Sequence, residues 1–164
     1  MGLFSFIKEA GAKIFGTKKA APAPTPEVKA PTLTQEEINS HKADELIDVI
    51  NDLNIPVESL YVAVDDDAVT IAGKTQSQSD REKVILAVGN TYGVATVDDK
   101  LEVDVPEPEA QFYTVQKGDS LSKIAKSVYG DAMKYPEIFE ANKPMLSHPD
   151  KIYPGQVLRI PNLA

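Results

Sequence analysis

Residues 112–161, FYTVQKGDSLSKIAKSVYGDAMKYPEIFEANKPMLSHPDKIYPGQVLRIP, form the most fully specified segment of the 164-residue chain. Apolar and polar residues alternate at its start, as in a short half-buried strand. A turn at 117–119 follows, and Asp119 or Ser120 can cap the helix that begins there. Gly130 ends that helix, a second helix is expected at 135–141, and a Pro-Gly turn precedes a last strand at 157–160. The segment therefore predicts the order strand, helix, helix, strand.

Three motifs in this segment, YTVQKGDSLSKIA, IFEANKP and IYPGQVLRIP, resemble those of a LysM domain and occur in the same order. LysM modules typically bind N-acetylglucosamine polymers such as peptidoglycan. By that resemblance, two turns would line a sugar groove. The same residues would also be needed simply to build turns, a cap and core contacts, so both interpretations stay open. The groove residues would be Gly118, Asp119, Ser120, Leu121, Ile152, Pro154 and Gly155.

The preceding part of the chain predicts a helix, a β-hairpin, a helix and a strand. The capping box Thr34-Gln35-Glu36-Glu37 opens the first helix. Three aspartates at 65–67 separate two β-prone runs, as in a hairpin. The sequence AVTIAGKTQSQSDREKVILAVGNTYGVATVDDKLEV then resembles a BON domain, whose second helix would end at Gly89-Asn90. The sequence thus predicts an α+β fold with two small domains, BON at 34–105 and LysM at 111–162, joined by a linker at 106–110.

The N-terminal residues 1–16 place Leu3, Phe4, Ile7, Ala10, Ile14 and Phe15 on one face of an expected amphipathic helix. This helix could dock on the body of the protein or lie in the plane of a membrane surface. An Ala/Pro-rich linker at 17–33 follows. The start of the chain lacks the features of a secretory signal, which favours a cytoplasmic location.

Composition narrows the classes of function. The net charge of −8 disfavours nucleic acid and anionic membranes as partners, and we expect a monomer. The absence of cysteine excludes disulfides and thiolate metal sites. The histidines, His41 and His148, lie in no evident nucleophile constellation. The acidic runs at 65–67 and 98–99 lack the spacing of a calcium loop. We therefore do not expect an enzyme.

The combination of MGLF at the start, ILAVGN in the middle and IFEANKPML near the end resembles the bacterial cytosolic potassium-binding family of BON–LysM architecture. The Ala/Pro-rich insertion near 17–31 departs from that pattern. The resemblance implies an intracellular K⁺ sensor that compacts its two domains on binding; the downstream partner is unknown. Glycan binding and membrane-surface adaptation are the alternatives.

Several neutral carbonyls suit a large monovalent cation because they replace its hydration shell. Carbonyls become available where a helix ends or a glycine loop turns. With the family resemblance, this predicts a K⁺ site built from the carbonyls of Ile7, Ala10, Gly89, Thr91 and Val94. Thr91 departs from the family, which has an apolar residue there, and Gly89 and Gly93 could serve only as a helix stop and a turn. We expect LysM to contact the rest of the chain through 138–144 and 151–154.

Overall fold

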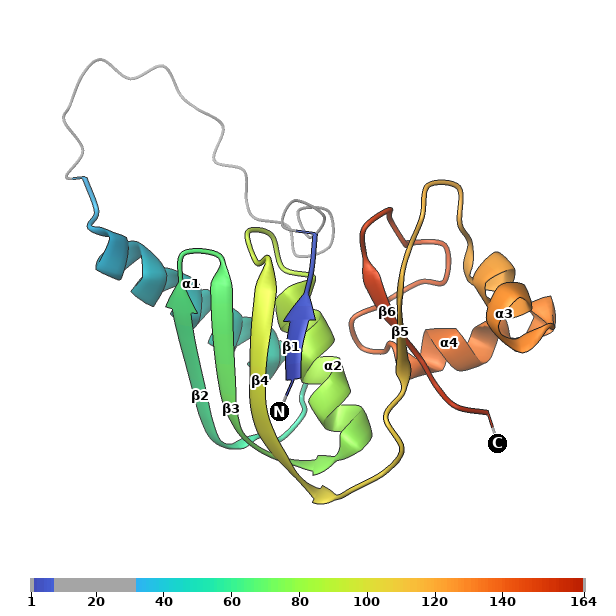
Figure 1. Ribbon diagram of the computed structural model, residues 1–164, viewed down its shortest axis with the longest axis horizontal. Coiled ribbons are helices and arrows are strands. Elements are labelled where there is room, and N and C mark those ends of the chain that lie inside the picture. The colour runs from blue at the N-terminus through green and yellow to red at the C-terminus, as the bar shows by residue number, and fades with distance from the viewer. Residues whose placement is uncertain (1, 8–31, 164) are drawn as a thin grey trace, which may run out of the picture.

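The computed structural model describes residues 2–7 and 32–163 of the chain. Two small α+β domains lie side by side, which confirms the predicted fold class (Figure 1). The first domain contains a four-stranded sheet and the second a two-stranded sheet. The predicted linker at 17–33 lies outside the described residues, apart from 32–33.

The first domain is a sheet with two helices packed on one face (Figure 1). The strand order is β1-β4-β3-β2. The hairpin of β2 and β3 is antiparallel, β3 and β4 are parallel, and β1 is antiparallel to β4. In chain order the elements are β1 (Gly2–Ser5), α1 (Gln35–Asp52), β2 (Glu58–Asp65), β3 (Ala68–Ser77), α2 (Gln78–Gly89) and β4 (Thr96–Val105).

The expected helix at 1–16 is wrong for its first residues, because Gly2–Ser5 form the edge strand β1. Phe4 pairs with Val97 of β4, and its ring lies 5.3 Å from the ring of Phe112. Leu3, on the opposite face of the strand, is 72% exposed. The pairing leaves Phe4 half-buried against the core without a helix, so the apolar spacing of the first residues fits strand alternation as well as a helical face. The rest of the expected helix, residues 8–16, lies outside the described residues.

Local sequence signals account for the ends of the helices. Thr34 and Glu37 form the predicted capping box at α1: the Thr34 N–H donates to Glu37 Oε2 at 2.8 Å, and the Glu37 N–H donates to Thr34 Oγ1 at 3.3 Å. Ser120 caps the first helix of the second domain by accepting from the Lys123 N–H at 3.3 Å. Gly130 ends the same helix in the left-handed conformation, with φ of 76°.

The second domain follows the predicted order strand, helix, helix, strand. Its antiparallel strands are β5 (Gln111–Thr114) and β6 (Val157–Ile160), and its helices are α3 (Leu121–Tyr129), the 3₁₀ turn η2 (Ala132–Lys134) and α4 (Tyr135–Ala141). Each domain has its own hydrophobic core. Leu86 of α2, however, packs in the core of the second domain, and Phe6 and Phe112 pack against both cores. The two domains therefore meet along α2.

Candidate cation site at the C-terminal end of helix α2

Helix α2 is the best buried helix of the first domain, and its sequence VILAVG explains why. Val84, Ile85, Ala87 and Val88 are all at most 1% exposed, as the sequence predicts. Asn90 follows as the cap with φ of −82° and ψ of 0°, so the chain leaves the helix without a left-handed residue. Gly89 and Asn90 are both buried, so the end of the helix lies inside the molecule.

The last carbonyl groups of α2 differ in whether they accept a hydrogen bond. The Asn90 N–H donates to Leu86 O at 2.9 Å, the Thr91 hydroxyl to Ala87 O at 2.8 Å, and the Thr91 N–H to Val88 O at 3.1 Å. Within the described part of the chain, the Gly89 carbonyl accepts no hydrogen bond. Helix C-termini normally leave four such carbonyls to be satisfied from outside. Here three have partners, and the Gly89 carbonyl is available for another ligand.

The chain just after β1 lies against this helix end. A Cβ added to Gly89 would stand 2.1 Å from the ring of Phe6, so the ring occupies the space that any side chain at 89 would need. The Phe6 N–H donates to Ala95 O at 2.7 Å. Ile7, the next residue, is 52% exposed. These contacts place Phe6 beside the end of α2 and the loop 90–95, and Ile7 is the next residue along the chain.

The far end of the loop is held by the β-hairpin. The N–H groups of Ala95 and Thr96 donate to Asp67 O at 2.8 and 3.3 Å. The Val94 N–H turns back to Thr91 O at 3.3 Å. The Val94 carbonyl accepts no hydrogen bond from the other described residues. The loop is therefore fixed at both ends and keeps a second carbonyl without a described partner.

Three of the five predicted K⁺ ligands, Gly89, Thr91 and Val94, thus lie at this helix end and its loop. Ile7 is the residue after Phe6, which contacts Gly89, and Ala10 lies outside the described residues. Gly89 and Val94 have carbonyls without a described donor, whereas the Thr91 carbonyl already accepts one hydrogen bond. The Thr91 hydroxyl is bound to the helix end, which gives a structural role to a polar residue at this position.

The electrostatics of this helix end favour a cation. The aligned peptide dipoles of a helix place partial negative charge at its C-terminus. The last turn of α2 carries no basic residue to neutralise it. On the solvent side, Thr91–Val94 line a pocket together with Lys42 and Glu45 of α1. The Lys42 ammonium is engaged there, because it donates to Asp66 O at 2.9 Å.

The side chain of Asn90 crosses from this loop to the second domain. Its Nδ2 donates to Val157 O and its Oδ1 accepts from the Val157 N–H, both at 2.8 Å. Nδ2 also lies 3.3 Å from the sulfur of Met145. Asn90 is 2% exposed. Nothing in the local sequence marks this role, because the contact joins residues 67 positions apart.

An ion pair between the domains lies further along α2, and the sequence reasoning missed it. Glu82 is 3% exposed, and its Oε2 accepts from Arg159 Nε of β6 at 2.5 Å. Its other oxygen accepts from the Ala110 N–H of the linker at 2.9 Å. The expected contact through 151–154 is therefore not the one that forms these bonds, which come from β6. The expected contact through 138–144 is met at its end, where Asn142–Pro144 line a small cavity with Leu53, Lys83 and Leu86.

The predicted sugar-groove residues lie in two turns that the second domain uses for itself. Asp119 Oδ2 accepts from Tyr113 Oη and from the Gln116 N–H, both at 2.8 Å, and the first of these bonds raises the pKa of Tyr113. The Gly155 N–H donates to Val115 O at 2.8 Å. Leu121 is buried, Ile152 is half-buried, and Gly118 and Pro154 are exposed.

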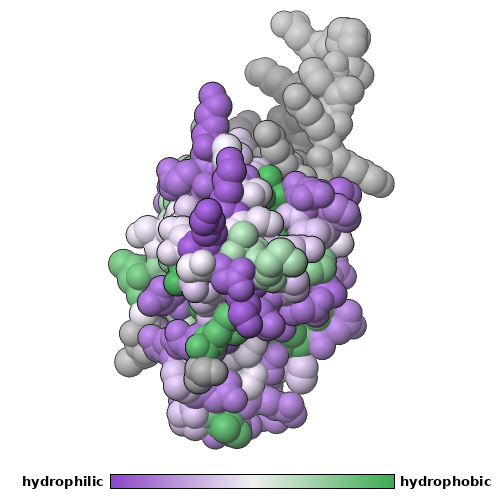
Figure 2. Space-filling model, turned by 90° about the vertical axis from the view of Figure 1, so that its right-hand side faces the viewer, coloured by the Kyte–Doolittle hydropathy of each residue, from purple (hydrophilic) through white to green (hydrophobic). Residues whose placement is uncertain are grey.

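The face of the second domain that points away from the first is mostly hydrophilic, with hydrophobic residues in small separate groups (Figure 2).

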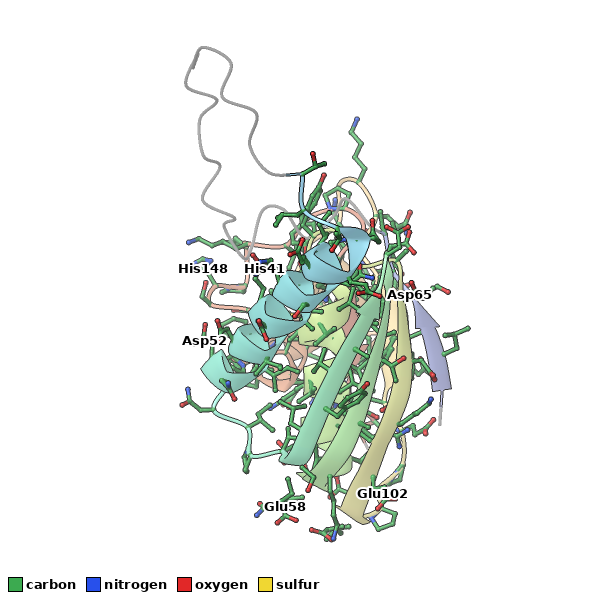
Figure 3. All side chains as sticks on the ribbon, turned by 90° about the vertical axis from the view of Figure 1, so that its left-hand side faces the viewer. His41, Asp52, Glu58, Asp65, Glu102 and His148 are labelled. Carbon is green, nitrogen blue, oxygen red and sulfur yellow. The ribbon has the colours of Figure 1, made fainter. Side chains whose placement is uncertain are left out.

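The titratable side chains labelled in Figure 3 are dispersed: His41 lies on α1, and Asp65 and Glu102 lie at opposite ends of the sheet. Residues 2–7 and 32–163 hold no group of three or more His, Asp or Glu side chains that could bind a metal ion. Every helix in these same ranges is too short or too polar to cross a bilayer.

Comparison with known proteins identifies both domains and their combination. The BON domain family matches residues 43–105, and the LysM domain family matches residues 113–161. The potassium binding protein Kbp of Escherichia coli is 43% identical over 162 residues, covering 98% of this chain and 99% of its own. The chain belongs to the Kbp family. Its match to an uncharacterized protein of Deinococcus radiodurans, 59% identical, spans only 49 residues, 30% of this chain and 19% of the other.

Proposed function

We propose that this member of the Kbp family binds K⁺ and acts as an ion sensor rather than as an enzyme. The observation that carries the proposal is the 43% identity, over 98% of the chain, to a protein named for potassium binding. The family likeness covers the BON domain, the LysM domain and the N-terminal residues together. The cytoplasmic location and monomeric state expected from the sequence are part of the same proposal.

The proposed K⁺ site is formed by backbone carbonyls of Ile7, Ala10, Gly89, Thr91 and Val94. The Gly89 and Val94 carbonyls, which accept no hydrogen bond from the described residues, and the dipole of α2 support this site, because both favour a cation without requiring a carboxylate. Carboxylate ligands close to the ion would favour smaller or divalent cations. A carbonyl site is therefore expected to select K⁺ over Ca²⁺.

The second part of the proposal is that K⁺ favours the compact arrangement of the two domains. The contact between α2 and β6 supports it, since three of the proposed ligands, Gly89, Thr91 and Val94, lie within four residues of Asn90, which bonds to Val157. An ion that binds one arrangement better than another shifts the population toward it by its difference in affinity. The arrangement of the two domains then depends on whether K⁺ is bound.

Calorimetric titration of the full chain with KCl, NaCl and CaCl₂ tests the proposal. We expect saturable K⁺ binding, clearly weaker Na⁺ binding and no Ca²⁺ binding at the same site. K⁺ should also raise the thermal midpoint of unfolding, because a ligand of the native state stabilises it by mass action. Absence of K⁺ binding, or equal affinity for Na⁺, would overturn the proposal. A parallel pull-down on peptidoglycan tests the glycan alternative, which predicts retention there.

A further inference from the structure

The outer edge of β6 is completed by two asparagine side chains from different domains. β6 pairs with β5 along one edge, with Val157 opposite Thr114 and Arg159 opposite Phe112. On the other edge, the Asn142 amide accepts from the Arg159 N–H at 2.7 Å and donates to Arg159 O at 2.8 Å. The Asn90 amide makes the equivalent pair with Val157. A side-chain amide thus replaces a neighbouring strand at each residue.

The two amides differ in what they hold together. Asn142 and Arg159 belong to the same domain, so their contact stabilises LysM itself. Asn90 belongs to BON, so its contact exists only when the domains are docked. Both Asn90 and Val157 are buried there, at 2% and 5% exposure. Loss of the Asn90 amide would leave the N–H and carbonyl of Val157 without these hydrogen bonds in the docked state, which is costly for buried polar groups.

Asn90 also lies between two residues of the proposed ion site in the chain. The carbonyl of the preceding residue, Gly89, accepts no hydrogen bond from the described residues, while that of the following residue, Thr91, accepts one from Val94. The backbone of Asn90 is held by its N–H bond to Leu86 O at 2.9 Å. Any ligand that fixes the peptide groups on either side of Asn90 also fixes the direction in which its side chain leaves the loop.

We infer that Asn90 is the positioning residue through which ion binding at Gly89 and the loop 90–95 controls docking of the LysM domain. The inference rests on the proposed K⁺ function and adds the contact that transmits it. The ion binds the peptide groups on either side of Asn90, and this favours the backbone orientation that presents the amide to the edge of β6. Because such coupling is reciprocal, docking must strengthen ion binding by the same factor by which the ion strengthens docking.

The test compares the full-length wild type with Asn90→Ala. The backbone of Asn90 has φ of −82° and ψ of 0°, which alanine adopts without strain, so α2 is expected to end as before. For each chain, ¹⁵N relaxation measures the tumbling of the two domains, and calorimetry measures the K⁺ dissociation constant. We expect K⁺ to make the wild-type domains tumble as one body. In Asn90→Ala they should tumble separately with and without K⁺, and the dissociation constant should rise about tenfold.

Two further variants separate docking from general damage. Asn90→Asp keeps the acceptor for the Val157 N–H but cannot donate to the Val157 carbonyl, so it should also uncouple the domains. Asn142→Asp makes the same chemical change on the same edge, inside LysM. It should lower the melting point of LysM yet keep K⁺-dependent joint tumbling in the temperature range where LysM is folded.

The outcomes distinguish this inference from the proposed function. If wild type binds K⁺ and both Asn90 variants still dock in response to it with an unchanged dissociation constant, the inference is overturned while the proposed function stands. If wild type does not bind K⁺, the proposed function fails and the coupling fails with it. Three results together support the inference: separate tumbling in both Asn90 variants, weakened K⁺ binding in Asn90→Ala, and joint tumbling in Asn142→Asp.

Discussion

The loop after α2 and the turns of the LysM domain are built from similar residues but use their polar groups differently. In the LysM turns, the polar groups of Asp119, Ser120 and Gly155 bond to neighbours within the same domain. In the loop after α2, Gly89 has a carbonyl without a described donor, and Asn90 bonds to the other domain. Glycines and polar residues in a turn are therefore weak guides to a binding site until each hydrogen bond has been assigned.

The interdomain ion pair gives the largest expected effect on stability, and it tests whether α2 is the docking helix. Glu82→Gln leaves the Arg159 guanidinium, 12% exposed, without its carboxylate. Breaking a buried pair by removing one partner costs about 3–5 kcal/mol. We expect chemical denaturation to show a loss of this size in the free energy of unfolding. The LysM domain should unfold at a lower denaturant concentration than in the wild type. The control Lys143→Gln removes the exposed pair with Glu140 and should cost less than about 1 kcal/mol. Equal effects would contradict the account.

A pair of glycine variants contrasts the two loops directly. Gly89→Ala would push its Cβ into the Phe6 ring, so β1 or the loop must shift and K⁺ affinity should fall at least about tenfold, or ~1.4 kcal/mol. Gly118→Ala meets no atom within 4 Å but is strained at φ of +87°. It should cost about 1 kcal/mol of LysM stability and leave K⁺ affinity unchanged. The comparison breaks if calorimetry finds the two K⁺ affinities equally reduced.

Removal of the α3 cap tests the claim that the LysM turns serve their own fold. Ser120→Ala deletes the acceptor of the Lys123 N–H, and loss of a serine cap costs about 1 kcal/mol. Thermal unfolding should therefore shift downward, while K⁺ titration should give the wild-type dissociation constant. Ser120→Asp, which can also accept this bond, should restore most of the lost stability. A change in K⁺ affinity without a change in stability would contradict the claim.

The smallest expected effect on stability concerns Tyr153, and it is confined to alkaline pH. Burial raises the pKa of Tyr153 to about 12, above the value of roughly 10 of an unfolded tyrosine. The neutral phenol is therefore favoured in the folded state. The stability that this preference contributes is fully present below about pH 10 and is lost as the pH rises toward 12. Tyr153→Phe should flatten the alkaline loss of LysM stability measured by denaturation at several pH values. An unchanged alkaline profile would show that another group causes the loss.

The sequence predicted those parts of the fold that depend on neighbours in the chain. The Thr34 capping box, the Ser120 cap and the Gly130 helix stop were recognisable because each involves residues within a few positions. The buried face of α2 was recognisable from its apolar run. Strand β1 was not, because its four residues, Gly2–Ser5, are too few to distinguish helix from strand spacing, and only pairing with β4 decides between them.

In the candidate site, too, the local features were predictable from the sequence and the tertiary contacts were not. Gly89 stood out in sequence as a helix stop, but its contact with the ring of Phe6 depends on β1 joining the sheet. The bonds of Asn90 to Val157 and of Glu82 to Arg159 join residues 67 and 77 positions apart. Such tertiary contacts leave no periodic pattern, so a single sequence cannot reveal them.

The most direct measurement is a titration of ¹⁵N-labelled protein with KCl, followed by amide chemical shifts, with NaCl as the control. We expect saturable, K⁺-specific shifts in three places: residues 6–7, residues 89–95, and the edge of β6 at Val157 and Arg159. The LysM turns at 118–121 and 152–155 should move little. Shifts confined to those turns, or identical shifts with NaCl, would contradict the account.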